Sequence, residues 1–288
     1  MRFHNYIFSG FKPKVVSDLI RIGNQETDGG YLISKRQIGL TKVLIGLGIN
    51  YDWSFEADFK ARNEGVSIYC YDFSVGKSIY RKGFLLSVLN ILSPNTYANM
   101  LFRKLKPRTV ITQPLTELKT LTRFNNFFKP SNNNFFFQSG VSDHRSSIFI
   151  TIEDVFSKIG NFDNLPENSV FIKMDIESSE YDILEDIIKH QSKINGLAIE
   201  FHNTKQLWNE FNYLVDELKK YFEIIHVHGN NCCGYVPDTQ IPNLVEITFL
   251  KRNLMDSQEI NSKNSNQYPL ANLDKPNMPK KPDLKLSF

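Results

Sequence analysis

The sequence predicts an α/β protein with a Rossmann-like, doubly wound mixed sheet of about seven strands, the last of them antiparallel to its neighbour. Short apolar runs recur along the chain and end in turn residues, and helical patterns lie between several of them. Near-continuous apolar strands that alternate with helices indicate a parallel sheet covered on both faces. Only residues 232–242 join the last two runs, which leaves no room for a crossover helix, so the final strand should run antiparallel.

The expected strands are the apolar runs at 42–48, 66–72, 135–143, 169–175, 195–202, 222–231 and 243–252. Apolar residues at helical spacing predict helices over 53–63, 180–193 and 204–221. These elements belong to one expected domain, residues 1–254, which is long enough to bury a large core. Residues 255–288 turn polar and then proline-rich, and we expect a linker followed by either an extended strap or a frayed tail.

Residues 74–130 interrupt this rhythm and predict a helical, basic insertion. The segment carries ten lysines and arginines against a single acid, Glu117. One interpretation is a solvated helical elaboration. The other is a lid over the carboxyl edge of the sheet that meets an anionic substrate or the surface of an acidic membrane.

Composition excludes several classes of protein. The net charge of +3 does not indicate a nucleic-acid partner, which usually requires a concentrated basic face. The three cysteines, Cys70, Cys232 and Cys233, form neither a disulfide framework nor a zinc pattern. No signal peptide and no membrane span are evident, although peripheral membrane contact stays open. We therefore expect a cytoplasmic protein, of unknown oligomeric state.

The first strand ends in a glycine-rich turn that is typical of a nucleotide site. Gly46 and Gly48 let the backbone pass close to a ligand, and Asp72 ends the second strand at a spacing that suits a ribose. A dinucleotide site would have a third glycine where Tyr51 stands. S-adenosylmethionine has no pyrophosphate and is therefore the favoured cofactor, with Asn50 as a polar neighbour.

Three further residues are candidates for cofactor contacts. Glu56 lies in the helix that follows the turn, and Ser142 and Asp143 follow the third strand, where an adenine ring is expected. A plain turn explains Ser142 and Asp143 equally well.

The stretch "FIKMDIESSEYDIL" places Asp175, Glu177 and Glu180 at the end of the fourth strand. Glu180 belongs to the first turn of a helix that Ser178 or Ser179 can cap, and it complements the helix dipole there. Asp175 and Glu177 have no such structural reason, and a general base, a clamp on a substrate hydroxyl or a metal ligand would use them.

Histidines at the ends of the next two strands are candidate proton acceptors. His202 and His228 are the predicted catalytic partners of Asp175, because imidazole titrates near neutrality. Two alternatives stay open. A metal-dependent hydrolase would use Asp175, Glu177, Glu200 and His202 as ligands, and a non-catalytic protein would bind nucleotide or glycan through its basic segment. A divalent metal beside the cofactor is also compatible with the sequence.

"KMDIESSEYDIL" resembles the K-[IM]-D-[IV]-E-G-[AS]-E-x-x-x-L signature of FkbM-type methyltransferases, and "RIGNQETDGGYLI", "LIGLGINYDWSFEADF", "VHGNN" and the "YPL…LDKPNMPKKPDL" ending agree with it. The resemblance implies a class I, S-adenosylmethionine-dependent O-methyltransferase acting on a sugar of a surface glycan or on another small acceptor. It makes Arg21, Asp28 and Tyr31 candidates for binding the substrate or the carboxylate end of the cofactor. Asn230, at the carboxyl end of the sixth expected strand, is a further candidate for substrate binding. The usual glycine of the signature is Ser178 here, which changes the turn that carries Glu177.

Overall fold

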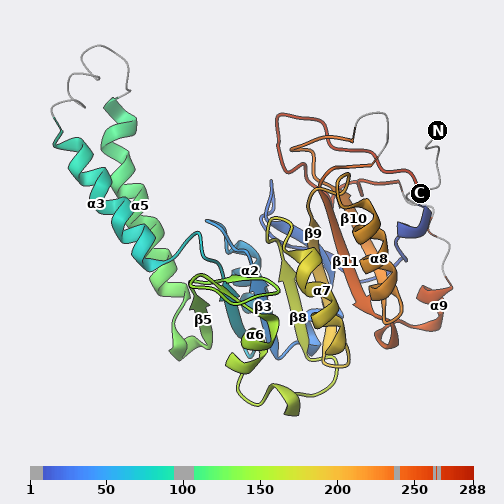
Figure 1. Ribbon diagram of the computed structural model, residues 1–288. Coiled ribbons are helices and arrows are strands. Elements are labelled where there is room, and N and C mark those ends of the chain that lie inside the picture. The colour runs from blue at the N-terminus through green and yellow to red at the C-terminus, as the bar shows by residue number, and fades with distance from the viewer. Residues whose placement is uncertain (1–8, 94–106, 237–240, 262–263, 265–266) are drawn as a thin grey trace.

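The computed structural model describes residues 9–93, 107–236, 241–261, 264 and 267–288, and its centre is a seven-stranded sheet (Figure 1). From one edge to the other the strands are β10 (Phe222–Gly229), β11 (Val245–Lys251), β9 (Ile194–Phe201), β8 (Val170–Met174), β3 (Val43–Leu47), β4 (Ser67–Tyr71) and β5 (Asn134–Phe137). The strands from β9 to β5 are parallel, whereas β11 is antiparallel to both β9 and β10. The predicted fold class is confirmed, including the antiparallel last strand.

The order of the strands fixes where a ligand site belongs. Counted along the chain, the strands of this sheet follow the order 3-2-1-4-5-7-6, and the direction of winding reverses between β3 and β8. Open α/β sheets bind ligands outside the carboxyl ends of the two strands at such a reversal. Leu47 at the end of β3 lies opposite Met174 at the end of β8, so the loops that follow leave the sheet side by side.

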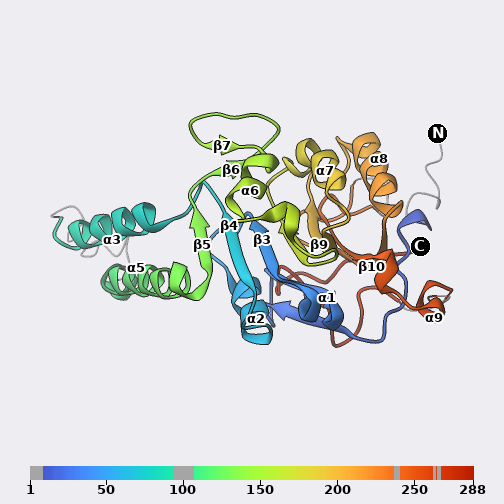
Figure 2. The same cartoon turned by 90° about the horizontal axis from the view of Figure 1, so that it is seen from below.

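Helices cover both faces of the sheet because its central strands are apolar on both sides. Every residue of β3, β8 and β9 is buried. Figure 2 shows one face covered by α1 (Lys35–Leu40) and α2 (Ser54–Arg62), and the other by α6 (Ile152–Lys158), α7 (Glu180–Lys189) and α8 (Trp208–Lys219). Each face holds its own hydrophobic core.

The third predicted strand, 135–143, is two strands. β5 ends at Phe137, and Gly140–Val141 forms β6, which pairs with β7 (Phe149–Ile150) outside the main sheet. The close pairing requires glycine, because a Cβ on Gly140 would lie 2.5 Å from the Phe149 ring. The turn after the third strand therefore leaves the edge of the sheet earlier than the apolar run suggests.

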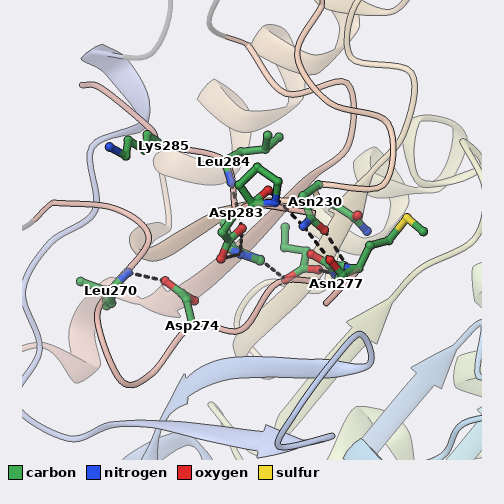
Figure 3. A network of polar contacts seen from close by, with 12 residues as sticks. Asn230, Leu270, Asp274, Asn277, Asp283, Leu284 and Lys285 are labelled. Carbon is green, nitrogen blue, oxygen red and sulfur yellow. Dashed lines mark hydrogen bonds and ion pairs between the residues drawn. The ribbon is translucent and has the colours of Figure 1, made fainter. Parts of the chain in front are cut away.

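The two ends of the described chain pack beside β10 and β11. Near the N-terminus, η1 (Ser9–Phe11) precedes the antiparallel pair β1 (Leu19–Gly23) and β2 (Gly30–Ser34). The short helix η4 (Arg252–Leu254) follows β11, and α9 (Ser257–Ile260) occupies part of the expected linker. Residues 267–288, here called the strap, are held by the polar network of Figure 3 and by a bridge between Tyr268 and Leu286.

The basic insertion forms a helical hairpin of α3 (Lys77–Ile91) and α5 (Pro107–Phe127), which is followed by η2 (Pro130–Asn132). Outside the insertion, the short helix η3 (Phe162–Asn164) precedes β8. The two helices of the hairpin pack along each other and project beyond β5, away from the sheet, in both views (Figures 1 and 2). This position differs from the expected one over the carboxyl edge. Residues 94–106 lie outside the described part of the chain. Among the described residues, no helix combines the length and the apolar composition needed to cross a membrane.

Candidate functional site

The loop after β3 passes directly over the end of β8, and glycine makes this approach feasible. Gly48 has a φ of 73°, and a Cβ there would lie 1.7 Å from the carbonyl oxygen of Asp175. Lys173 Nζ, on β8, donates a hydrogen bond of 2.6 Å to the carbonyl oxygen of Gly48. The predicted glycine turn and the predicted acidic turn therefore form one continuous rim.

Asp72 organises the other side of this rim. Its Oδ2 accepts hydrogen bonds from the backbone amides of Ile49 and Asn50, at 3.0 and 2.8 Å. Its Oδ1 accepts from the backbone amide and the hydroxyl of Ser74, both at 2.7 Å. An ionised carboxylate has about four acceptor positions, so a ribose hydroxyl would replace the Ser74 hydroxyl. The role of Asp72 toward a ribose stays a prediction.

A cavity of about 370 Å³ opens between these loops, at the carboxyl ends of β3, β4 and β8. Its polar lining includes Asn50, Asp72, Ser74, Asp175, Glu177 and Ser179. Its apolar lining includes Tyr71, Phe73, Val141, Phe149 and Ile176. The volume falls in the usual range for small-molecule sites. The aromatic wall was not foreseen, because Phe149 belongs to a two-residue strand that carries no periodic signal.

Two predicted cofactor residues lie outside the cavity lining. The Ser142 hydroxyl donates to the carbonyl oxygen of His144 at 3.0 Å, and the exposed Asp143 pairs with the His144 ring at 2.7 Å. Their neighbour Val141 lines the cavity instead.

Glu56 lies beneath the glycine turn, and it too is absent from the cavity lining. It is buried, and a Cβ on Gly46 would come within 2.7 Å of its Oε1. Burial raises the pKa of Glu56 to about 7, although the nearby Lys173 ammonium opposes this rise. Among the described residues, Oε1 of Glu56 has no hydrogen-bond partner.

The turn after Asp175 has an unusual backbone. Glu177 and Ser178 have φ values of 56° and 84°, so Ser178 adopts the conformation that a glycine would adopt without strain. The expected cap is wrong: Ser179 precedes the helix but makes no side-chain cap, and the Ser178 hydroxyl accepts from Asn203 Nδ2 at 2.7 Å. The turn is held instead by Glu180, whose Oε2 accepts from the Ser178 amide at 2.9 Å.

Glu180 also orients His202, a role that sequence reasoning missed. Oε1 of this fully buried carboxylate accepts from the His202 amide at 2.7 Å and lies 3.1 Å from its Nδ1. Since a carboxylate only accepts, Nδ1 is the donor, and Nε2 is directed toward Asp175 and Glu177, each 3.6 Å away. Burial lowers the pKa of His202, but the hydrogen bond to Glu180 and the neighbouring carboxylates outweigh burial and raise it.

Acidic groups continue behind His202. Glu200 is buried and accepts from Asn230 Nδ2 at 2.7 Å. Its pKa is raised well above the ordinary value by burial and by the charges of Asp175, Glu246 and Asp28. Asp175, Glu200 and His202 each offer a ligand atom within 4.8 Å of the others, a mixed set of donors that suits a divalent cation.

Lys173 is the buried cation that faces this cluster. Its Nζ lies 3.6 Å from Asp175 Oδ2 and 5.7 Å from the centre of the Tyr31 ring. Burial lowers the pKa of Lys173, but the charges of Asp175 and Glu56 outweigh burial and raise it. Tyr31 is itself buried, and its pKa is raised well above the ordinary value by burial and by Asp175. The predicted substrate residue Tyr31 thus borders the acidic cluster from the side of β2.

The remaining predicted residues are not brought to Asp175. His228, on β10, lies between Glu246 and Asp283 of the strap, at 3.3 and 3.0 Å. Asp28 accepts from Asn277 Nδ2 of the strap at 2.9 Å, and burial raises its pKa. Arg21 donates to the carbonyl oxygens of Asn24 and Thr27, at 2.7 Å each, and so braces its own loop.

A second cavity of about 520 Å³ lies beside the strap. Its lining includes Val16, Leu19, Gln267, Pro269, Leu270 and Leu273. The described residues of its lining include no titratable side chain, and we give it no role in chemistry.

No protein-family model and no curated protein matches the sequence. Solved structures do match: a chain of a fibrillarin/Nop5p complex is 11% identical over 73% of both chains, with a TM-score of 0.36. A fibrillarin pre-rRNA processing protein from Methanococcus jannaschii is 9% identical over 75% of this chain and 68% of that chain, with a TM-score of 0.35. An rRNA methylase from Streptococcus thermophilus is 8% identical over 75% and 93%, with a TM-score of 0.33. Likeness at this level carries no information on activity, and the fold rests on the strand order itself.

Proposed function

We propose that the chain is an S-adenosylmethionine-dependent O-methyltransferase. The observation that carries the proposal is the chemistry of the cavity wall. The amides of Gly48, Ile49 and Asn50 all donate to the end of β4, at the Tyr71 carbonyl and the Asp72 carboxylate. This part of the loop therefore has no N–H left for a pyrophosphate, and the carboxylates around the cavity would repel one.

The same wall suits a cationic ligand. Asp72, Asp175 and Glu177 line the cavity, and Phe73 and Phe149, 5.4 Å apart between ring centroids, supply an aromatic side. S-adenosylmethionine carries a sulfonium, an ammonium and an adenine ring, and so matches both the acidic and the aromatic parts. When bound, it supplies an electrophilic methyl group.

The residues of this chain would position the acceptor and remove a proton. The acceptor oxygen gains a bond to the methyl carbon, the bond from sulfur to that carbon breaks with its electron pair left on sulfur, and the hydroxyl proton passes to a base. His202 Nε2, held by Glu180 on the opposite side of the ring, is the proposed base, with Asp175 orienting the hydroxyl. We assign the catalytic role to His202 and Asp175, and we place His228 outside the reaction.

The acceptor class is proposed to be a sugar hydroxyl. Asp175 and Glu177 line the cavity and offer acceptors for hydroxyl groups, and Glu200 lies behind Asp175 as a further carboxyl group. The resemblance of "KMDIESSEYDIL" to FkbM-type methyltransferases supports the same acceptor. The positive φ at Ser178 supports it further, because the turn keeps the backbone conformation that the usual glycine of the signature would allow.

Calorimetric titration tests the cofactor. We expect S-adenosylmethionine to bind and NAD not to bind, and we expect Asp72→Ala to weaken binding by about tenfold or more, since it removes a charged acceptor and frees the loop. Asp143→Ala is the matched control and should leave affinity unchanged. Equal affinity in wild type and Asp72→Ala would remove the assignment of the site.

A second candidate is a metal-assisted or metal-dependent hydrolytic reaction, favoured by the three ligand atoms of Asp175, Glu200 and His202. Titration with Mg²⁺, Mn²⁺ and Zn²⁺ separates the cases. Metal binding that Glu200→Gln abolishes, together with hydrolysis that needs no S-adenosylmethionine, would replace the proposed function. Metal binding combined with cofactor binding would indicate a metal-assisted transfer.

A further inference from the structure

The hairpin of α3 and α5 exposes an apolar surface that the fold does not use. Seven leucines are exposed among the described residues; five of them are on these two helices, and a sixth is the residue that caps the end of α3. We call these six the hairpin leucines: Leu85, Leu86, Leu89, Leu92, Leu115 and Leu118, which are 42–67% exposed. Apolar exposure that is concentrated in one segment of a fold indicates an interaction surface.

The side by which the two helices pack is already occupied. Ser87 and Pro114 are buried, and a Cβ on Gly83 would lie 3.2 Å from Glu117 on the other helix. At the base, Phe124 packs against Tyr80 and Trp53 at 5.2 and 5.7 Å between ring centroids. The hairpin leucines thus lie on the outside of a braced hairpin and are not core residues that lack a partner helix.

Positive charge accompanies these leucines. Residues 74–130 have a net charge of +9, whereas the whole chain has +3, so the remainder of the chain is net negative at −6. In the described part, Lys77, Arg81 and Lys82 on α3 and Lys119 and Arg123 on α5 have no carboxylate within 4.0 Å. The insertion is therefore a concentrated basic region on an otherwise acidic molecule.

The hairpin leucines lie between basic residues in the sequence. On α3 the cations occupy positions 77–82, and the leucines at 85–92 follow them. On α5 the leucines at 115 and 118 lie between Arg108 and the cations at 119 and 123. An apolar surface flanked by lysines and arginines is typical of helices that lie in the plane of a membrane interface.

We propose that the α3–α5 hairpin docks the protein on an anionic lipid surface. The hairpin leucines enter the boundary between headgroups and acyl chains, and the cations that flank them bind the lipid phosphates. A nucleic acid would use the cations but leave six leucines exposed to water. A second copy docked hairpin to hairpin would bring two basic segments together. This proposal does not depend on methyl transfer.

Vesicle flotation with the full-length protein tests the proposal. We expect at least tenfold tighter binding to vesicles containing about one third phosphatidylglycerol than to pure phosphatidylcholine, because each cation near an anionic surface adds about 1 kcal/mol, and tenfold in affinity corresponds to about 1.4 kcal/mol. Raising the salt from about 0.1 to about 0.5 M should weaken binding by about tenfold. Equal binding to both vesicles, or none, would overturn the proposal.

Paired variants separate the two contributions. Lys82→Glu/Lys119→Glu and Leu89→Ser/Leu92→Ser should each weaken binding to anionic vesicles by about tenfold or more. Lys35→Glu/Leu40→Ser, on exposed positions of α1, is the matched control and should bind as wild type does. All positions are exposed, and circular dichroism checks that each variant folds. Binding unaffected by both hairpin pairs, or a dimer in sedimentation that Leu89→Ser/Leu92→Ser dissociates, would overturn the proposal.

Discussion

His202 and His228 lie at the same edge of the sheet, the first directly after β9 and the second on β10, and both are buried among carboxylates. His202 has one ring nitrogen fixed by Glu180, while the other is directed toward Asp175 and Glu177, which line the cavity. His228 has both nitrogens held, one by Glu246 and the other by Asp283 of the strap. The same residue types therefore form a candidate reactive site in one place and a structural tie in the other.

The strap accounts for the difference. It places Asp274 against His226 at 3.0 Å and Asp283 against His228 at 3.0 Å, so both histidines of β10 are covered. No such segment covers His202 in the part of the chain that the structure describes, and a cavity lies beside its carboxylate partners. The two histidines therefore differ in the carboxylates that face them. Asp175 and Glu177 beside His202 line an open cavity, whereas Asp283 beside His228 belongs to the strap that covers the ring.

Substitution of the two histidines tests this comparison with the largest expected effect. We expect His202→Gln to lower methyl transfer to sugar acceptors by about a hundredfold or more, the contribution of a positioned base, while cofactor affinity stays unchanged. His228→Gln should keep turnover within about threefold. Labelled S-adenosylmethionine and a panel of nucleotide sugars provide the assay. Equal losses in both variants would mean that His228 also takes part in the reaction.

Removing the carboxylate supplied by the strap addresses the structural side. Asp283→Ala leaves His228 with one partner and should lower the free energy of unfolding by about 2–3 kcal/mol, because it breaks a largely buried pair. Urea denaturation measures the loss. Asp216→Ala, on an exposed pair with Lys219, is the control and should cost less than about 0.5 kcal/mol. If the two variants lost equal stability, the strap would not be fixed by this pair.

The two clusters also differ in their expected response to pH. Burial lowers the pKa of His228, but its hydrogen bonds to Asp283 and Glu246 outweigh burial and raise the pKa well above 6.5. A raised pKa in the folded state stabilises the protein fully below about pH 6.5 and loses this contribution as pH rises through the folded pKa. The midpoint temperature of thermal unfolding should therefore fall more steeply between pH 6 and pH 9 in wild type than in His228→Gln. If the unfolding temperatures of the two proteins changed with pH in parallel, His228 would not be held by Asp283 and Glu246 as a charged group.

The smallest expected effect concerns the turn beside His202. Ser178 adopts a positive φ at a cost that glycine avoids, but its hydroxyl accepts from Asn203. Relief of strain of about 1 kcal/mol and loss of this bond should nearly cancel, so Ser178→Gly should change stability by less than about 1 kcal/mol and retain activity. Ser178→Ala keeps the strain, loses the bond and should be the less stable variant. The reverse order would show that the turn is not strained at this position.

The apolar runs of the sequence carried most of the information about the sheet. Strands buried on both faces need continuous apolar residues, and the short 232–242 connection determined that β11 is antiparallel. The carboxyl-end positions of Gly48, Asp72 and Asp175 followed from the same pattern, and these residues do share one cavity. These features were predictable because they depend on the local period of the chain and on the polarity of the sheet.

The tertiary structure alone decided which polar groups meet. Glu180 had a sufficient local role at the start of a helix, so nothing in the sequence indicated that it also orients His202 across the gap to the next strand. His228 looked equivalent to His202 until Asp283, 55 positions away, was placed against it. Side-chain partners depend on how distant segments pack and on which of them cover a strand end, and the local spacing of residues contains no record of either.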